Sequence, residues 1–355
     1  MKRLIAGIMI FGGLGQIATA QVVLDANGPG DTYELINSVL APGYTAVETP
    51  DCGHLDFGRH IDEVFDNDLN TNVFRFFIHA NIDNDRCEKF DRQRNEIKTY
   101  DQSPDNLKAV IGETVVYNWK FKLPEGFQSS SSFTHIHQLK GVGGEYEDMP
   151  LITFTTRKGT PDKLELRYAA ESTQTTLTSV DLTPFKGVWV EVTESVSFAT
   201  VGSYSVTIKT VDGGTVLLSY ENNSLNTYKE GASFLRPKWG IYRSLNNVSD
   251  LRDEEVLFAS FSINELITTA AADNIVDVEE FVLIPNPATN TVKISGKLAA
   301  NFSGISIYNK IGQKVMSLNE QRTEFSISSL KAGLYFLTLI TPAGESKPAK
   351  LMKIE

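Results

Sequence analysis

Two histidines lie two residues apart in the stretch Thr134–Gly141, which reads THIHQLKG. If this stretch is a β-strand, alternation places His135 and His137 on one face and Ile136 on the other. Imidazoles titrate near neutral pH, so the pair predicts proton-transfer chemistry. Lys140 is a further candidate acid, although strict alternation points it away from the histidines. It reaches them only if the strand ends or bulges near Leu139-Lys140-Gly141.

Two other stretches predict strands that carry matching polar faces. Residues 91–98 read DRQRNEIK, and alternation lines up Arg92, Arg94, Glu96 and Lys98. Residues 238–243 read KWGIYR, and alternation lines up Lys238 and Tyr242, with Arg243 next in the chain. Three such strand faces predict one polar cleft on a sheet. We expect Glu96 to form an ion pair with a neighbouring Arg or Lys.

Metal binding is the main alternative for these residues. His-x-His on one strand face, with His79 as a third ligand, is a set of residues that suits a zinc site. The flanking Arg and Lys strands suit an anionic ligand better, so we predict no metal in the site and no required cofactor. Asp66-Asn67-Asp68 and Asp83-Asn84-Asp85 offer oxygen ligands to a structural calcium ion, although neither is a complete calcium-loop motif. His54 and His60 are interpreted as surface or structural residues.

The composition is that of a globular, exported protein. The chain has 355 residues, 41% of them hydrophobic, and a formal net charge of −11, which argues against nucleic acid and anionic membranes as partners. Residues 1–20 combine a basic start, a short apolar run and an Ala-Thr-Ala end, which predicts a secretory signal peptide. No later run is long and apolar enough to span a bilayer. In an oxidising compartment the only two cysteines, Cys52 and Cys87, predict one disulfide, which the loop-entropy model values at roughly 3–4 kcal/mol.

Strand patterns dominate the rest of the sequence. From Val73 onward, β-rich stretches follow one another at regular spacing, and Asp212-Gly213-Gly214 gives a hairpin signal between two of them. This pattern predicts an all-β protein with a sandwich or jelly-roll fold over residues 21–265. A polar, alanine-rich linker is predicted at 266–280, and a compact strand-rich module at 281–355.

The C-terminal module resembles the C-terminal sorting domain of type IX secretion. The resemblance rests on Pro285-Asn286-Pro287-Ala288-Thr289-Asn290, Gly312-Gln313-Lys314-Val315, Leu330-Lys331-Ala332-Gly333-Leu334-Tyr335 and the terminal Lys350-Leu351-Met352-Lys353. It implies a small β-sandwich that directs the protein through the type IX machinery to a secreted or cell-surface location.

The larger unit resembles the jelly-roll polysaccharide lyases. Alginate lyases of this group carry Arg-x-Glu-x-Arg, Gln-Ile-His and Tyr-Phe-Lys-x-Gly-x-Tyr strands. The matching stretches are Arg94-Asn95-Glu96-Ile97-Lys98, His135-Ile136-His137 and Pro237-Lys238-Trp239-Gly240-Ile241-Tyr242. Lys98 replaces an arginine, and His135 stands in place of the glutamine. The fuller pattern, DRQRNEIK with HIHQLKG, looks more like the marine flavobacterial lyases that act on ulvan, a sulfated polymer of rhamnose and uronic acids.

This resemblance implies an endo-acting lyase that cleaves an anionic uronate-containing polysaccharide by β-elimination. Such a reaction needs a group that neutralises the uronate carboxylate, a base that removes the C5 proton and an acid that protonates the leaving oxygen. Arg94 is expected to neutralise, with His135 assisting; His137 or Tyr242 is expected to be the base, and Tyr242 or Lys140 the acid. Further substrate contacts are expected from Arg92, Lys98, Lys238 and Arg243. Glucuronan or alginate lyase activity and a noncatalytic carbohydrate-binding or adhesin role are the alternatives. A glycoside hydrolase is disfavoured because we find no convincing pair of flanking carboxylic acids.

Overall fold

The computed structural model describes residues 19–266, 281–309, 313–341, 344–346 and 348–354. Residues 1–18 of the predicted signal peptide and 267–280 of the predicted linker lie outside these ranges. The chain divides into two compact units, residues 1–270 and 271–355, which are described separately.

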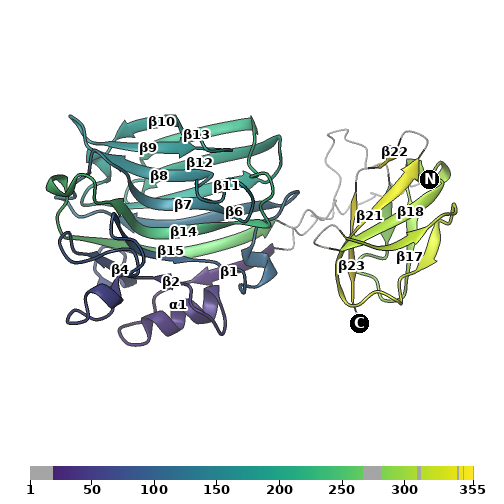
Figure 1. The fold of residues 1–355 in the computed structure, drawn as a ribbon, viewed down its shortest axis with the longest axis horizontal. Coiled ribbons are helices and arrows are strands. Elements are labelled where there is room, and N and C mark those ends of the chain that lie inside the picture. The colour runs from purple at the N-terminus through teal and green to yellow at the C-terminus, as the bar shows by residue number, and fades with distance from the viewer. Residues whose placement is uncertain (1–18, 267–280, 310–312, 342–343, 347, 355) are drawn as a thin grey trace, which may run out of the picture. The chain divides into compact units, whose positions relative to one another are not determined.

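Two antiparallel sheets build the first unit (Figure 1). The first sheet runs in the order β13 (Val216–Leu225), β12 (Gly202–Thr210), β11 (Trp189–Ser197), β6 (Thr114–Lys122), β15 (Glu254–Leu266), β4 (Thr71–Ile78) and β3 (Ile61–Asp66), and β1 (Thr19–Leu24) also pairs with β15. The second sheet runs in the order β10 (Thr175–Asp181), β9 (Lys163–Tyr168), β8 (Ile152–Arg157), β7 (Thr134–Val142), β14 (Phe234–Ser244), β5 (Arg92–Lys98) and β2 (Val47–Glu48). The predicted all-β sandwich is confirmed.

The alternation of apolar side chains explains why the two sheets stack. In β6, every second residue from Val115 to Phe121 is buried, while the residues between them are half-buried. The buried side chains of β6 meet those of the second sheet in one hydrophobic core, where the rings of Trp119 and Trp239 lie 5.9 Å apart. Removing this apolar surface from water is the main force that holds the sandwich together.

The central strands of the second sheet depart from that alternation. In β7 every residue from Thr134 to Leu139 is buried, and in β5 every residue from Gln93 to Lys98 is buried. The inner face of these strands packs into the core through Ile97 and Leu139. The outer face is therefore also covered, although it carries charged and polar residues, which marks it as the place to look for a site.

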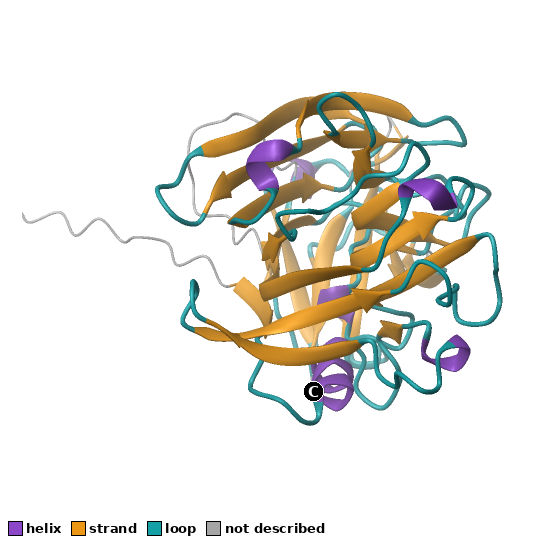
Figure 2. Ribbon diagram, turned by 90° about the vertical axis from the view of Figure 1, so that its left-hand side faces the viewer, coloured by secondary structure: helices purple, strands orange, loops and turns teal. Residues whose placement is uncertain are grey.

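Helices are short and few beside the strands (Figure 2). The single α-helix of the described residues is α1 (Thr32–Leu40), which buries Ile36 and Leu40 in the core of the first unit. Short 3₁₀ helices occupy Asp51–Gly53, Asp105–Leu107, Thr183–Phe185, Val248–Asp250 and Lys297–Ala300.

The second unit has its own sheets and its own hydrophobic core. One sheet contains β16 (Val282–Ile284), β17 (Thr291–Ser295) and β20 (Glu324–Ser326). The other contains β19 (Lys314–Leu318), β18 (Gly304–Asn309), β21 (Gly333–Thr341) and β22 (Gly344–Glu345), with β23 (Ala349–Lys353) paired to β21. Side chains from both sheets, including Ile294, Ile307 and Leu339, form the core of this small β-sandwich.

Candidate active site

Three neighbouring strands bring most of the predicted residues to one face. In the pairing of β14 with β5, Tyr242 lies opposite Arg94 and Lys238 lies opposite Lys98. On its other edge, β14 places Tyr242 opposite His135 and Lys238 opposite Gln138 of β7. We call the outward side of these three strands the charged face; its members are Arg92, Arg94, Glu96, Lys98, His135, Gln138, Lys140, Lys238 and Tyr242.

A β-bulge in β7 separates the two histidines. His135 pairs with Thr155 of β8 and His137 pairs with Phe154, so two steps along β7 correspond to one step along β8. A bulge of this kind reverses the sides to which the following residues point. The prediction that His135 and His137 share a face is therefore wrong: His135 belongs to the charged face, whereas His137 points into the core.

His137 is fully buried between the sheets. Its Nε2 atom lies 2.9 Å from Oε2 of Glu194 in β11, and its ring lies 4.4 Å from the ring of Trp119. Glu194 also accepts a hydrogen bond of 2.7 Å from the hydroxyl of Tyr204. This pair links the two sheets and leaves His137 without access to a polymer, so the structure does not support its predicted role as the base.

The same bulge brings Gln138 and Lys140 onto the charged face. Gln138 donates a hydrogen bond of 2.5 Å to Glu96, and Leu139 between them is fully buried in the core. Lys140 thus reaches this face, but through a bulge several residues earlier than the sequence suggested. Gln138 was missed at the sequence level. Its signal was the alternation of the polar Gln138 and Lys140 around the apolar Leu139.

Gly240 permits a second irregularity, in β14. The pairing of β14 with β7 shifts register between Trp239 and Tyr242, and Gly240 has a φ of +142°. A Cβ atom at Gly240 would lie 2.1 Å from the backbone oxygen of Asn95. Only glycine fits this close approach, which lets β14 bend and still present Tyr242 beside Arg94.

Buried ion pairs occupy much of the charged face. Lys238 Nζ lies 2.5 Å from Glu48 and 2.6 Å from Glu96, and Lys98 Nζ lies 2.6 Å from Glu48. Burial raises the pKa of Glu96, but Lys238 and Arg94 outweigh it and lower that pKa to about 2. The expectation that Glu96 forms an ion pair is confirmed. Lys98 and Lys238, predicted as substrate contacts, are paired to carboxylates, and Glu48 is a partner that the sequence did not reveal.

Arg94 is also committed to protein partners. Its guanidinium donates to Asp85 at 3.0 Å and to Glu96 at 2.5 Å, and it stacks 3.7 Å from the centre of the Tyr242 ring. Burial alone would lower the pKa of Arg94, but the charges of Glu96, Glu48 and Asp85 raise it by a larger amount. The guanidinium therefore remains charged. Arg94 thus contributes positive charge beside Tyr242, while two of its donors are engaged by carboxylates.

Arg243 does not belong to the charged face. It follows Tyr242 in the strand, so it points to the opposite side, where it is almost fully buried. It donates hydrogen bonds of 2.7 Å to Gln93 and 2.9 Å to the carbonyl of Arg252. The prediction that Arg243 contacts substrate is wrong, because strand alternation places it behind the sheet.

Tyr242 and His135 lie next to each other on the charged face. Arg92, which also pairs with Asp91, donates a hydrogen bond of 2.8 Å to the Tyr242 hydroxyl, and the His135 ring lies 5.9 Å from the Tyr242 ring. Burial raises the pKa of Tyr242 despite the opposing effect of Arg94 and Arg92. Tyr242 is therefore protonated near neutral pH, which suits an acid rather than a base.

His135 and Lys140 have lowered pKa values, as does Lys98, whose pKa burial lowers to about 8. Burial, opposed by Glu96 and helped by nearby arginines, lowers the pKa of His135 to about 3, so its imidazole is neutral. Its Nδ1 atom lies 2.8 Å from the hydroxyl of Thr155. Burial and the charges of Lys238, Arg94 and Arg236 lower the pKa of Lys140 to about 8. A lysine with such a pKa has an appreciable neutral fraction and can accept a proton.

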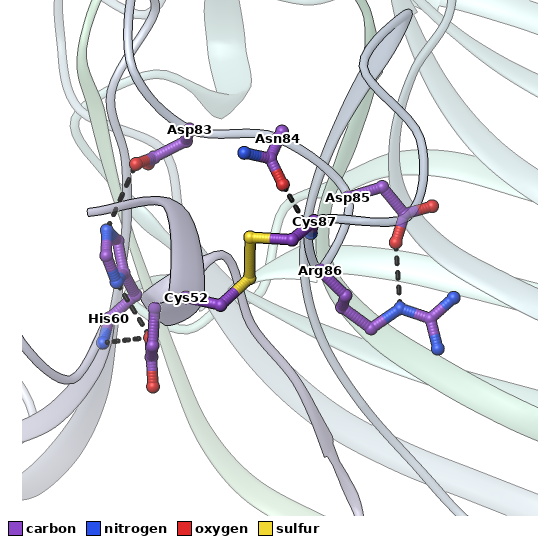
Figure 3. Close-up of a disulfide and its surroundings, with 8 residues drawn as sticks. Cys52, His60, Asp83, Asn84, Asp85, Arg86 and Cys87 are labelled. Atoms are coloured by element: carbon purple, nitrogen blue, oxygen red, sulfur yellow. Dashed lines mark hydrogen bonds and ion pairs between the residues drawn. A yellow bond between two sulfur atoms is a disulfide. The ribbon is translucent and has the colours of Figure 1, made fainter. Parts of the chain in front are cut away.

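The predicted disulfide is confirmed between Cys52 and Cys87, and Figure 3 shows it beside His60 and Asp83. The two acidic runs considered for calcium contact protein groups. Asp66 accepts from the indole of Trp189, and Asp68 pairs with Lys122. In the second run, Asp85 pairs with Arg94 and Arg86, while Asp83 faces histidines. The zinc alternative with His135, His137 and His79 is wrong, because the bulge directs the first two to opposite faces.

Residues 71–261, more than half of the chain, match the polysaccharide lyase family. The chain belongs to this family. The outward-facing Lys140 and Tyr242 of this polysaccharide lyase therefore lie within the family domain, on strands that the domain provides.

Several solved lyase structures resemble this polysaccharide lyase in fold. An endo-β-1,4-glucuronan lyase from the fungus Trichoderma reesei is 16% identical, with a TM-score of 0.40, covering 57% of this chain and 85% of its own. A marine alginate lyase of family PL-14 from Aplysia kurodai is 13% identical, with a TM-score of 0.45, covering 68% and 97%. An alginate lyase from Pseudomonas aeruginosa is 14% identical, with a TM-score of 0.40, covering 57% and 84%. A comparison with curated proteins found no match.

Residues 282–353 of the polysaccharide lyase match the secretion system C-terminal sorting domain. This module indicates export through the type IX secretion system, as the sequence motifs predicted. Within the part of the chain that the structure describes, no helix has the length and apolar character needed to span a bilayer.

Proposed function

We propose that this protein is an endo-acting lyase that cleaves a uronate-containing sulfated polysaccharide, ulvan, by β-elimination. The observation that carries the proposal is the placement of Lys140 and Tyr242 on one cation-rich face of a polysaccharide lyase domain. In this reaction a base removes the C5 hydrogen of the uronate, the electron pair forms the C4–C5 double bond, and the bond to the glycosidic oxygen breaks.

Lys140 is proposed as the base. Its pKa of about 8 gives a neutral amine in the mildly alkaline range, and the amine takes the C5 proton with its lone pair. Lys140 has no ion-pair partner among the residues described, in contrast to Lys98 and Lys238 on the same face. A lysine kept free of a carboxylate keeps its lone pair available once it loses its proton.

Tyr242 is proposed as the acid. Its raised pKa keeps the hydroxyl protonated until the glycosidic oxygen leaves. The tyrosinate that forms is then stabilised by Arg92, 2.8 Å from the hydroxyl oxygen, and by Arg94 over the ring. After the product leaves, Lys140 loses the proton it took and Tyr242 regains the proton it gave, both by exchange with water.

Neutral donors on the charged face are proposed to hold the uronate carboxylate. Gln138 uses one donor on Glu96 and keeps a second N–H, and the neutral His135 ring has its Nε2 side available. Hydrogen bonds to the carboxylate lower the cost of the carbanion-like charge that develops when the C5 proton leaves. We therefore assign the neutralising role chiefly to Gln138 and His135, with Arg94 supplying positive charge beside Tyr242.

Ulvan is proposed as the polymer because DRQRNEIK and HIHQLKG resemble the ulvan-acting lyases. Additional cations flank Lys140: Arg236 lies close enough to lower its pKa, and burial together with the charge of Lys140 lowers the pKa of Lys229 to about 8. Such positive charge suits a chain that carries sulfate as well as carboxylate groups. Glucuronan and alginate are the alternative polymers.

The test follows the ultraviolet absorbance of the new double bond conjugated to the carboxylate. The full-length chain, oxidised at its disulfide, is mixed separately with ulvan, glucuronan and alginate. A rise with ulvan, accompanied by an early fall in viscosity, supports the proposal of endo-acting ulvan cleavage. A rise only with glucuronan or alginate replaces the substrate, and binding without any rise favours the noncatalytic carbohydrate-binding role.

A further inference from the structure

A cluster of three histidines and one aspartate lies behind β5, away from the charged face. His54, His60, His79 and Asp83 each offer one ligand atom, and these atoms all lie within 4.8 Å of one another. Asp83 is the centre of the cluster. Its Oδ1 lies 3.2 Å from both His54 Nδ1 and His60 Nε2, and its Oδ2 lies 3.1 Å from His79 Nδ1.

We propose that these four residues bind a structural Zn²⁺ ion. Imidazole nitrogen with a carboxylate oxygen is a donor set that zinc accepts, and four protein ligands are the number that a structural zinc site uses. With metal–ligand distances of about 2.0–2.2 Å, tetrahedral ligands lie roughly 3.3–3.6 Å apart. The histidine–aspartate distances already approach this range, so modest inward shifts of the imidazoles complete the site.

The hydrogen bonds of His60 point to a cation at this position. Its Nδ1 lies 2.8 Å from Asp51 and its Nε2 faces Asp83, so the ring lies between two carboxylates; Figure 3 shows the contact with Asp83. Without a metal, a ring with a hydrogen on both nitrogens satisfies both carboxylates. A metal ion that replaces the hydrogen at Nε2 bonds to Nε2 and to Asp83, while Nδ1–H still donates to Asp51, and a carboxylate behind a histidine ligand is the usual outer partner in zinc sites.

The surroundings of the cluster favour a buried, structural metal site rather than a catalytic one. His60 and Asp83 have fully buried side chains, and those of His54 and His79 are only 17% and 20% exposed. The Phe57 ring covers the cluster, with centroids 4.4 Å from His79 and 4.7 Å from His60. Both cysteines of the chain are joined in the disulfide, so no thiolate competes for the metal.

The zinc site would stabilise the loops that pack behind β5, a strand that carries residues of the charged face. The Gln93 side chain donates hydrogen bonds to the carbonyls of His79 and Asp83, and Asn95 donates to the carbonyl of His60. Asp85, two residues after Asp83, pairs with Arg94 on the front of the same strand. Metal binding therefore stabilises the loop that positions Asp85, without the metal entering the reaction.

The experiment uses the full-length chain, purified without a histidine tag and with the disulfide intact. After dialysis against zinc and then against metal-free buffer, elemental analysis gives the zinc content, and titration against a chromophoric chelator gives the affinity. We expect one equivalent of zinc, a higher melting temperature with zinc than after chelation, and intense visible bands of tetrahedral Co²⁺ when cobalt replaces zinc.

Variants locate the site. His54→Ala and His79→Ala, both partly exposed, should weaken zinc binding by more than about 100-fold, and Asp51→Asn by about 10–100-fold. His135→Asn removes a histidine elsewhere and should keep the full equivalent. Loss of all zinc in metal-free buffer, a chelator-insensitive melting temperature, octahedral cobalt spectra, or unchanged binding in His54→Ala and His79→Ala would each overturn the proposal. The cobalt spectrum of the parent keeps the test decisive if a variant fails to fold.

Discussion

The guanidinium carbon of Arg94 lies 3.7 Å from the centre of the Tyr242 ring, on neighbouring strands that pair these residues directly. A cation in this position stabilises the phenolate more than the phenol, while burial of the ring favours the phenol. Burial dominates in the free protein, so Tyr242 is protonated near neutral pH, as the proposed acid role requires.

Tyr242→Phe tests this role, because it keeps the ring against Arg94 and removes only the hydroxyl. We expect kcat to fall by about 10²–10⁴-fold, as loss of a general acid does, with KM little changed. Initial rates of double-bond formation on the accepted polymer measure both. Turnover close to that of the parent would remove Tyr242 from the mechanism.

Lys140→Arg tests the base, because arginine keeps the positive charge but does not lose its proton near neutral pH. We expect a loss of kcat of about 10²–10⁴-fold with substrate binding retained. In the parent, kcat/KM should rise with pH through about 8 as Lys140 becomes neutral, and fall only above the ordinary tyrosine pKa of 10.0. A profile without a rise near pH 8 would argue against Lys140.

Glu48→Gln tests the buried ion pairs. Glu48 lies within 3.1 Å of Arg86, Lys98 and Lys238, so its loss leaves the buried Lys98 without a carboxylate among the residues described and leaves the buried Lys238 with Glu96 alone. We expect the free energy of unfolding to fall by about 3–5 kcal/mol in denaturant titration. Glu191→Gln, which breaks a partly exposed pair with Lys209, is the control and should cost no more than about 1 kcal/mol. Equal effects of the two changes would contradict the buried-network description.

The same network predicts acid sensitivity. Burial raises the pKa of Glu96, but Lys238 and Arg94 lower it to about 2, well below the ordinary 4.5. A carboxyl whose folded-state pKa is depressed stabilises the fold fully above its unfolded pKa and loses that effect as pH falls. Stability should therefore decline between about pH 4.5 and 2, and Glu96→Gln should flatten that decline in thermal unfolding measured across this range.

His137→Gln separates the core histidine from the charged face. Glutamine retains a donor for Glu194 but packs less well against Trp119, so we expect a lower melting temperature and a kcat close to that of the parent. Circular dichroism and initial rates on the same sample give both readouts. Abolished turnover in a variant that melts like the parent would restore His137 as a candidate base.

The sequence was a good guide where alternation is regular and a poor one where a bulge intervenes. Alternation correctly grouped Arg94, Glu96 and Lys98 on β5 and excluded Ile97. It failed at His135 and His137, because a bulge depends on how β7 pairs with β8 and β14, and neither partner is visible from β7 alone. Gly240 was a local signal of irregular pairing, since glycine within a strand often marks a bulge.

The other contacts that the sequence did not predict join residues that are far apart along the chain. Glu48 meets Lys98 and Lys238 from a two-residue strand, and the cluster around Asp83 collects histidines from two separate segments. Such contacts need the sheet order, which periodicity does not give. The fold class, by contrast, depends on many repeated patterns, so one misplaced residue does not alter it.

Strand β5 has consequences for how this protein can change over evolutionary time. Its side chains alternate between the two sides of the sheet. Gln93 and Asn95 donate hydrogen bonds to the loops behind the sheet, while Arg94 and Glu96 form an ion pair on the charged face. A mutation at a rear position can thus alter substrate preference without contacting any sugar. Divergence of specificity among such proteins should then leave traces on both sides of this strand, as paired substitutions rather than independent ones.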